Sequence, residues 1–160
     1  MAFNTYSFSN TAVVIAPPTG AAFTLNGQGI GEITIDWIND NTAHDLAADG
    51  TVMVSKITAA NANFTITAQQ TSNLHQYLRG LFNALYQAPS NLWAGTTITI
   101  TSLDGSFDNV ILTGVSFAKQ ATQPFQAQGQ MVTWNMMAAN AVTQGSLAGS
   151  FINANLSNNI

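Results

Sequence analysis

The stretch Ile33-Thr34-Ile35-Asp36-Trp37 alternates apolar and polar side chains with a period of two residues. Successive side chains of a β-strand point to opposite faces of its sheet. The three apolar side chains therefore share one face, while Glu32, Thr34 and Asp36 share the other. We expect the first face to pack on a core and the second to lie outside it.

The same alternation recurs along most of the chain, in runs rich in β-branched residues, aromatic residues and hydroxyls, which are typical of strands. Glycine, Asn, Asp and Pro clusters separate these runs and supply the turns between them. Asp104-Gly105 lies between two of the runs and predicts a hairpin. Besides 33–37, the candidate strands are 11–16, 51–58, 64–68, 97–101, 110–117 and 130–138.

One segment has a helical period. From Thr71 to about Gln87, leucines recur at positions 74, 78, 81 and 85, which places them on one face of a helix. Thr71 or Ser72 can cap its N-terminus, and Pro89 follows its end. A single amphipathic helix among many strands predicts a mainly β (α+β) domain, an antiparallel β-sandwich or barrel with one helix packed on it.

Only 6% of the residues are charged, whereas an ordinary soluble domain has about 25%. A polar surface without interspersed charges is poorly suited to a free monomer, so this composition favours a building block covered by its own copies. The seven acidic residues outnumber the three basic ones, which argues against binding nucleic acid through its phosphates. The absence of cysteine excludes disulfides and thiolate metal sites. No apolar run is long enough for a membrane span, and no secretory signal is recognisable, so we expect assembly inside a cell.

The two ends of the chain differ from its middle. We expect a β domain over residues 1–138 and an extended C-terminal arm over 139–160, where the periodicity is lost. Phe151, Ile152, Leu156 and Ile160 are spaced apolar residues that could dock on a neighbouring subunit. A frayed terminus is the alternative.

No pattern of catalytic, cofactor-binding or metal-ligating residues stands out. The acidic and amide residues between Asp36 and Asp49 lack the order of a calcium loop, and a loop composition explains them. His44 is interpreted as a polar loop residue and His75 as a helix-surface residue. Ser72 and His75 lack an orienting acid, so we expect no enzyme. The glycines at 27, 29 and 31 precede a strand and lack a P-loop lysine, which favours a turn.

The order of these elements resembles that of the tail tube proteins of contractile-tailed bacteriophages. The resemblance covers most of residues 1–137. It rests on the opening Ala2-Phe3-Asn4-Thr5-Tyr6-Ser7-Phe8, the glycine turn before Gly31-Glu32-Ile33-Thr34-Ile35, the acidic loop ending Ala48-Asp49-Gly50-Thr51-Val52-Met53, and then strand, helix and a closing β run.

The resemblance implies six-membered rings that stack into a hollow tube for the viral genome, in a virion tail assembled in the host cytoplasm. Implied partners are other copies of the chain and the sheath, tape measure and baseplate proteins, with DNA passing through without specific binding. Candidate lumen residues are Glu32, Thr34 and Asp36, and candidates for a flexible loop between rings are Asp40, His44, Asp45 and Asp49. Two alternatives are another viral shell or decoration protein and a carbohydrate-binding β-sandwich, for which Trp37, Trp93 and Trp134 are candidates, although Trp37 and Trp134 fall on apolar strand faces that predict a core.

Overall fold

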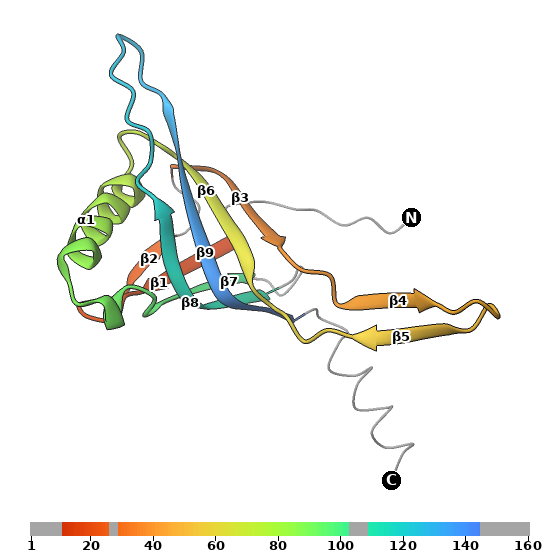
Figure 1. Ribbon diagram of the computed structural model, residues 1–160. Coiled ribbons are helices and arrows are strands. Elements are labelled where there is room, and N and C mark those ends of the chain that lie inside the picture. Colours follow the sequence, from red (N-terminus) through yellow and green to blue (C-terminus); the bar gives the residue numbers. More distant parts are fainter. Residues whose placement is uncertain (1–10, 26–28, 103–108, 145–160) are drawn as a thin grey trace, which may run out of the picture.

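Seven strands form one antiparallel sheet in the computed structural model, which describes residues 11–25, 29–102 and 109–144. The order across the sheet is β2-β1-β7-β8-β9-β6-β3 (Figure 1). The strands are β1 (Thr11–Ala16), β2 (Phe23–Leu25), β3 (Ile30–Trp37), β6 (Ala62–Gln69), β7 (Thr96–Ser102), β8 (Asn109–Lys119) and β9 (Met131–Gln144).

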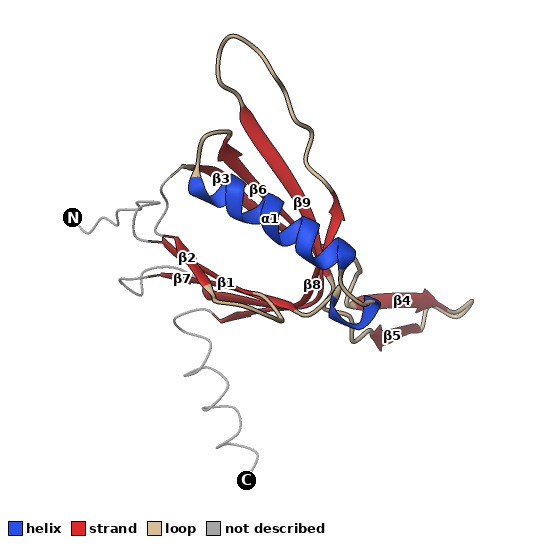
Figure 2. Cartoon of the chain, turned by 90° about the vertical axis from the view of Figure 1, so that its left-hand side faces the viewer, coloured by secondary structure: helices blue, strands red, loops and turns tan. Residues whose placement is uncertain are grey.

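The sheet bends around α1 (Asn73–Gln87), the one α-helix among the described residues, so that β1, β2 and β7 lie on one side of it and β3, β6 and β9 on the other (Figure 2). A short 3₁₀ helix, η2 (Ser90–Leu92), follows α1. The sheet and helix together form a half-barrel closed by the helix, which agrees with the predicted fold class.

The bend coincides with an irregularity in β8. Leu112 and Val115 are both buried although they are three residues apart, because Gly114 between them has a φ of 64° and shifts the alternation by one residue. A positive φ is readily adopted by glycine alone, and a Cβ at this position would lie 2.8 Å from the Cβ of Ala139 on β9. Glycine inside an alternating run is a recognised sign of a β-bulge, which bends a strand.

The core fills the space between α1 and the concave face of the sheet. Trp134, Phe64 and Ile66 are its largest contributors from β9 and β6, and none of the three exposes more than 1% of its surface. The leucines of α1 face them: Leu74, Leu78, Leu81 and Leu85 are all buried, as the helical spacing predicts. The Ser72 hydroxyl accepts a hydrogen bond of 3.2 Å from the backbone N–H of His75 and caps the helix, which confirms the predicted start.

Two further strands leave this body altogether. β4 (Thr42–Leu46) and β5 (Val52–Lys56) pair with each other alone, and they project on the side of the sheet away from α1 (Figure 1). Gly50, with a φ of 91°, lies in the turn between them. We call residues 38–60 the hairpin arm.

The predicted strands are confirmed, with one correction to their extent and two strands that the sequence did not reveal. β9 continues to Gln144, so residues 139–144, assigned above to the C-terminal arm, belong to the sheet; Ala141 is buried and Val142 pairs with Ile111. The small residues Ala138, Ala139 and Ala141 hide the alternation there. β2 and β4 were not predicted. The hairpin predicted at 104–105 has its two strands, β7 and β8, paired as expected, and its turn lies outside the described residues.

Candidate functional site

The convex face of the sheet is polar over β3 and β6 and mixed over β8 and β9, where Ile111, Met137 and Val142 are exposed. Thr65 on β6 donates a hydrogen bond of 3.2 Å to the Asn135 side chain on β9, and the Thr67 and Thr133 hydroxyls share one of 3.3 Å. The predicted lumen residues lie on this same face: the register aligns Glu32 with Thr67, Thr34 with Thr65, and Asp36 with Asn63. We call this set the outer face: Glu32, Thr34, Asp36, Asn63, Thr65, Thr67, Thr133 and Asn135.

The charges of the outer face are confined to β3. Glu32 and Asp36 are both exposed, and Glu32 accepts a hydrogen bond of 3.1 Å from the Thr34 hydroxyl. β6 and β9 contain no charged residue. On β3 and β6 a phosphate group would meet hydroxyls, amides and the carboxylates of Glu32 and Asp36, while Lys119 lies opposite Asn135 in the register of β8 and β9.

The sheet ends in two unpaired edges. β3 and β2 occupy its two ends, and within the described chain neither has a strand on its outer side. An open edge presents unpaired backbone N–H and C=O groups that pair readily with another strand. Within the described residues, both edges are therefore open to pairing with a further strand.

The predicted inter-ring residues lie along the hairpin arm, where the structure corrects the expectation of a loop. His44 and Asp45 belong to β4, opposite Val54 and Met53 of β5, while Asp40 lies before the strand and Asp49 in the turn after it. The Asp49 carboxylate accepts a hydrogen bond of 3.0 Å from the backbone N–H of Thr51. The sequence Asp49-Gly50 between two short runs is a hairpin signal that could have identified β4.

His75 is buried, which overturns its interpretation as a helix-surface residue. Its Nδ1 accepts a hydrogen bond of 3.0 Å from the indole Nε1–H of Trp134. Burial, with the positive charge of Arg79 as a second cause, lowers the pKa of His75, so the imidazole is held neutral. Ser72 caps the helix and His75 accepts the hydrogen bond from Trp134, so both side chains have structural roles.

The three tryptophans have different environments. Trp134 is fully buried, as its strand face predicts. Trp37 is not in the core: 39% of its surface is exposed, because β3 leaves the sheet there, and its Nε1 donates to the Ala141 carbonyl at 3.2 Å. Trp93 is half-buried beside a cleft of about 390 Å³ between α1, η2 and the end of β8.

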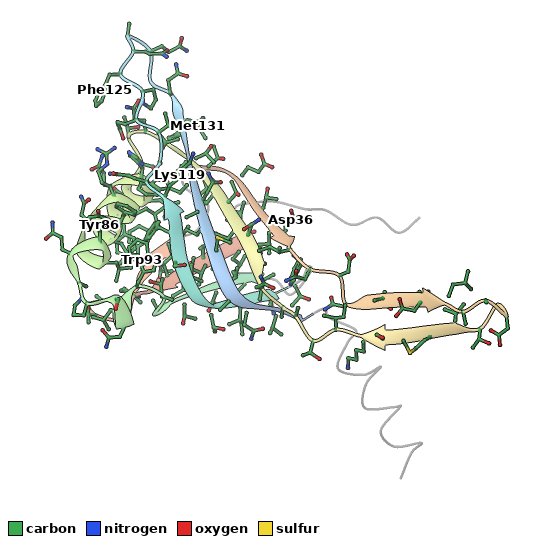
Figure 3. The ribbon with its side chains drawn as sticks, in the orientation of Figure 1. Asp36, Tyr86, Trp93, Lys119, Phe125 and Met131 are labelled. Carbon is green, nitrogen blue, oxygen red and sulfur yellow. The ribbon has the colours of Figure 1, made fainter. Side chains whose placement is uncertain are left out.

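This cleft has an aromatic floor. Phe82 contacts Phe117 with ring centroids 5.4 Å apart and Tyr86 at 5.9 Å, and Trp93 meets Phe82 edge-on. Lys119 is the one charged residue in its lining, and Figure 3 shows it above Tyr86 and Trp93. We call it the aromatic cleft.

The described residues contain no group of three His, Asp or Glu side chains that could hold a metal ion. Among the helices of the described part, none is long and apolar enough to cross a membrane.

Comparison with known proteins assigns the chain to a family. Residues 3–144 match the family described as the bacteriophage PhiTE tail tube protein. The chain belongs to the tail tube family. The matched segment ends where β9 ends, which supports residues 139–144 as part of the same domain. No curated protein matches the sequence.

Solved structures of contractile injection systems are similar to this tail tube protein in fold. A chain of the anti-feeding prophage baseplate has a TM-score of 0.58 at 11% identity, with 91% of this chain and 99% of that chain covered. A chain of the PVC sheath/tube terminator in the extended state has a TM-score of 0.57 at 10% identity, covering 91% and 100%. A chain of the PVC sheath-tube complex has a TM-score of 0.55 at 13% identity, covering 87% and 90%.

Two features of this tail tube protein were missed by sequence reasoning. The aromatic cleft joins Phe82, Trp93 and Phe117 from three elements, and no local spacing connects them. The exposed apolar residues of the hairpin arm, such as Leu46, could have been recognised once Asp49-Gly50 was taken as a hairpin turn. The predicted docking residues Phe151, Ile152, Leu156 and Ile160 lie outside the described residues, and their role stays a prediction.

Proposed function

We propose that this chain is a non-enzymatic tail tube subunit that assembles into rings, six copies to a ring, which stack into a channel for a genome. The observation that carries the proposal is a sheet with two open edges whose outer face has two charged side chains, the carboxylates of Glu32 and Asp36 on β3. Pairing the β3 edge of one copy with the β2 edge of the next would close a ring and remove both edges from solvent. The concave face, already covered by α1, would then lie outside the ring.

In this arrangement the outer face lines the lumen. Hydroxyls and amides give passing DNA no phosphate site, and Glu32 and Asp36 repel it, so the wall would let DNA slide without specific binding. The hairpin arm is the proposed contact between rings, because an isolated two-stranded hairpin is at best marginally stable in water and needs a surface to pack on.

We infer the remaining partners from the family. We propose that the tube contacts sheath, tape measure and baseplate proteins in a virion tail assembled in the host cytoplasm. The similar structures come from a baseplate and a sheath-tube complex, which supports tail partners of this kind.

Negative-stain electron microscopy of the purified chain tests the assembly. Hollow rods or rings at micromolar concentration are expected, together with light-scattering masses well above 16.9 kDa. A profile that stays monomeric on concentration would overturn the proposal, and flat discs or closed shells would favour a shell or decoration protein.

A charge reversal tests the lumen. Glu32→Lys combined with Asp36→Lys should leave tubes intact and make them retain DNA at low salt. The control is Asn83→Lys with Asn91→Lys, which adds two lysines among exposed residues on the helix side of the sheet. Equal DNA retention by both variants would contradict the assignment of the outer face to the lumen.

A further inference from the structure

The hairpin arm leaves the sheet through two short connections. On the outward path, β3 ends at Trp37 and β4 begins at Thr42. On the return path, β5 ends at Lys56 and β6 begins at Ala62. Neither β4 nor β5 contains a buried residue, and both belong to a separate two-stranded sheet. Two bare connections would act as hinges, because few buried contacts would oppose the movement of the hairpin relative to the body.

The structure ties both connections to one residue of β9, Ala141. Its backbone N–H donates a hydrogen bond of 2.8 Å to the Ala60 carbonyl, and its own carbonyl accepts one of 3.2 Å from the indole Nε1–H of Trp37. Ala141 is itself buried in the body. Trp37 directly precedes the arm and Ala60 is the last residue of the arm. The two ends of the arm therefore meet at a single fixed point of the sheet.

Three asparagines join the two connections farther from the sheet. The Asn39 amide donates a hydrogen bond of 2.7 Å to the side-chain oxygen of Asn61. The Asn41 amide donates to two carbonyls of the return path, at 3.0 Å to Ile57 and at 2.8 Å to Ala59. An amide side chain has two N–H donors, which allows one asparagine to serve both carbonyls. Side-chain hydrogen bonds thus replace the backbone ladder where the two sheets separate.

The contacts lie at successive levels along the arm. Trp37 and Ala141 form the level nearest the sheet, Asn39 forms the next, and Asn41 forms the one beside the start of β4. A single contact would leave a pivot about which the arm could turn, whereas contacts at several levels oppose rotation about any one of them. Exposed hydrogen bonds contribute little net stability, so their main effect here is on geometry.

We propose that Trp37, Asn39 and Asn41 are positioning residues that fix the direction of the hairpin arm in the free subunit, before any other copy binds (Figure 1). We call these contacts and those of Ala141 the clamp. Only its consequence for assembly rests on the proposed ring. An arm whose direction is already set loses less conformational entropy when copies meet than an arm that has to be ordered at that moment.

Distance measurements on the free subunit test the clamp. The chain has no cysteine, so Ala48→Cys in the exposed turn of the arm and Asn83→Cys on the exposed side of α1 introduce two sites for spin labels. Pulsed electron paramagnetic resonance, at concentrations where light scattering finds only monomers, should give one narrow distribution of distances. A broad distribution, as expected of a hairpin on two free hinges, would overturn the proposal.

Two substitutions remove parts of the clamp. Trp37→Phe keeps an aromatic ring and removes the N–H that the Ala141 carbonyl accepts, and Asn41→Ala removes both bonds to the return path. Each should widen the distance distribution about twofold or more, while the circular dichroism of the body stays unchanged. Trp93→Phe and Asn91→Ala, at half-buried and exposed positions outside the arm, are the matched controls and should leave the distribution as it is.

Hydrogen exchange supplies a second readout in the same free subunit. The Ala141 N–H is bonded to Ala60, and the Ile57 N–H on the return path donates a hydrogen bond of 2.9 Å to the Asn41 carbonyl. Both amides should exchange slowly if the connections are held together, and faster in Trp37→Phe. Exchange of both amides in the unmodified protein at the rate of an unstructured chain would contradict the clamp.

The outcomes separate this inference from the proposed function. Distances within the free subunit do not depend on tube formation, so a chain that never assembles would overturn the ring and leave the clamp standing. A chain that forms tubes but has a broad distribution as a monomer would overturn the clamp alone. A narrow distribution kept by both Trp37→Phe and Asn41→Ala would also overturn it, because other contacts would then fix the arm.

Discussion

The body of this protein and its hairpin arm are built from similar residues with opposite results. In the body, β6 alternates buried and exposed side chains along its whole length, because α1 covers one face of the sheet. In the arm, β4 has no buried residue at all. Strand formation in the body is stabilised by a core within one chain, whereas the arm has no such core, and its packing on another copy is our proposal. Substitutions in the two regions should therefore affect different measurements.

The largest effect is expected at the centre of the body. Trp134→Ala would leave a cavity and orphan the Nδ1 of His75, and loss of a large buried aromatic side chain costs about 3–5 kcal/mol. Chemical denaturation of the monomer measures the free energy of unfolding. Trp37→Ala, at a half-exposed site, should cost far less, and equal losses would contradict the distinction between core and periphery.

A second effect of a few kcal/mol is expected at the bend. Gly114→Ala places a Cβ on a residue with a φ of 64° and 2.8 Å from the Cβ of Ala139. Backbone strain of this kind costs on the order of 1–3 kcal/mol, before the clash is counted. Gly80→Ala, on the exposed side of α1 with nothing within 4 Å, should be neutral or stabilising in the same denaturation assay.

The sequence was sufficient for the periodic part of the fold and insufficient for this bend. Strands such as Thr11–Ala16 and the helix follow from side-chain alternation and leucine spacing, since each signal lies within a few residues. The burial of His75 depends instead on Trp134, fifty-nine positions away, and the aromatic cleft depends on three separate elements. Long-range packing of this kind leaves no local period.

The buried imidazole of His75 should make the free energy of unfolding depend on pH. Its lowered pKa means that the unfolded chain binds a proton more readily than the folded one. The stabilisation is therefore present above the unfolded pKa of about 6.5 and is lost as the pH falls below it, with a slope of at most about 1.4 kcal/mol per pH unit. His75→Gln should flatten this slope between pH 6.5 and 5, whereas His44→Asn, on the exposed arm, should preserve it.

A smaller effect is expected at the start of α1. Ser72→Ala removes the hydroxyl that accepts the His75 N–H, and loss of an N-cap costs about 1 kcal/mol. Thr71→Ala, one residue earlier and exposed, is the control and should change the free energy of unfolding little. If Thr71→Ala lowered the free energy of unfolding more than Ser72→Ala does, the assignment of the cap to Ser72 would be wrong.

The smallest effect on the monomer is expected from the arm. Leu46→Ser replaces a side chain that is already 76% exposed, so the free energy of unfolding should change by no more than about 0.5 kcal/mol. Leu78→Ser, the same substitution in the buried stripe of α1, removes a side chain with no exposed surface and should destabilise the monomer by several kcal/mol, at the scale of a large-to-small core substitution. Tube assembly should show the opposite order of effects. At concentrations where both variants are folded, Leu46→Ser should lose tubes and Leu78→Ser should keep them. If Leu46→Ser instead unfolds the monomer, the arm is stabilised by its own chain, and the contrast between the two regions is wrong.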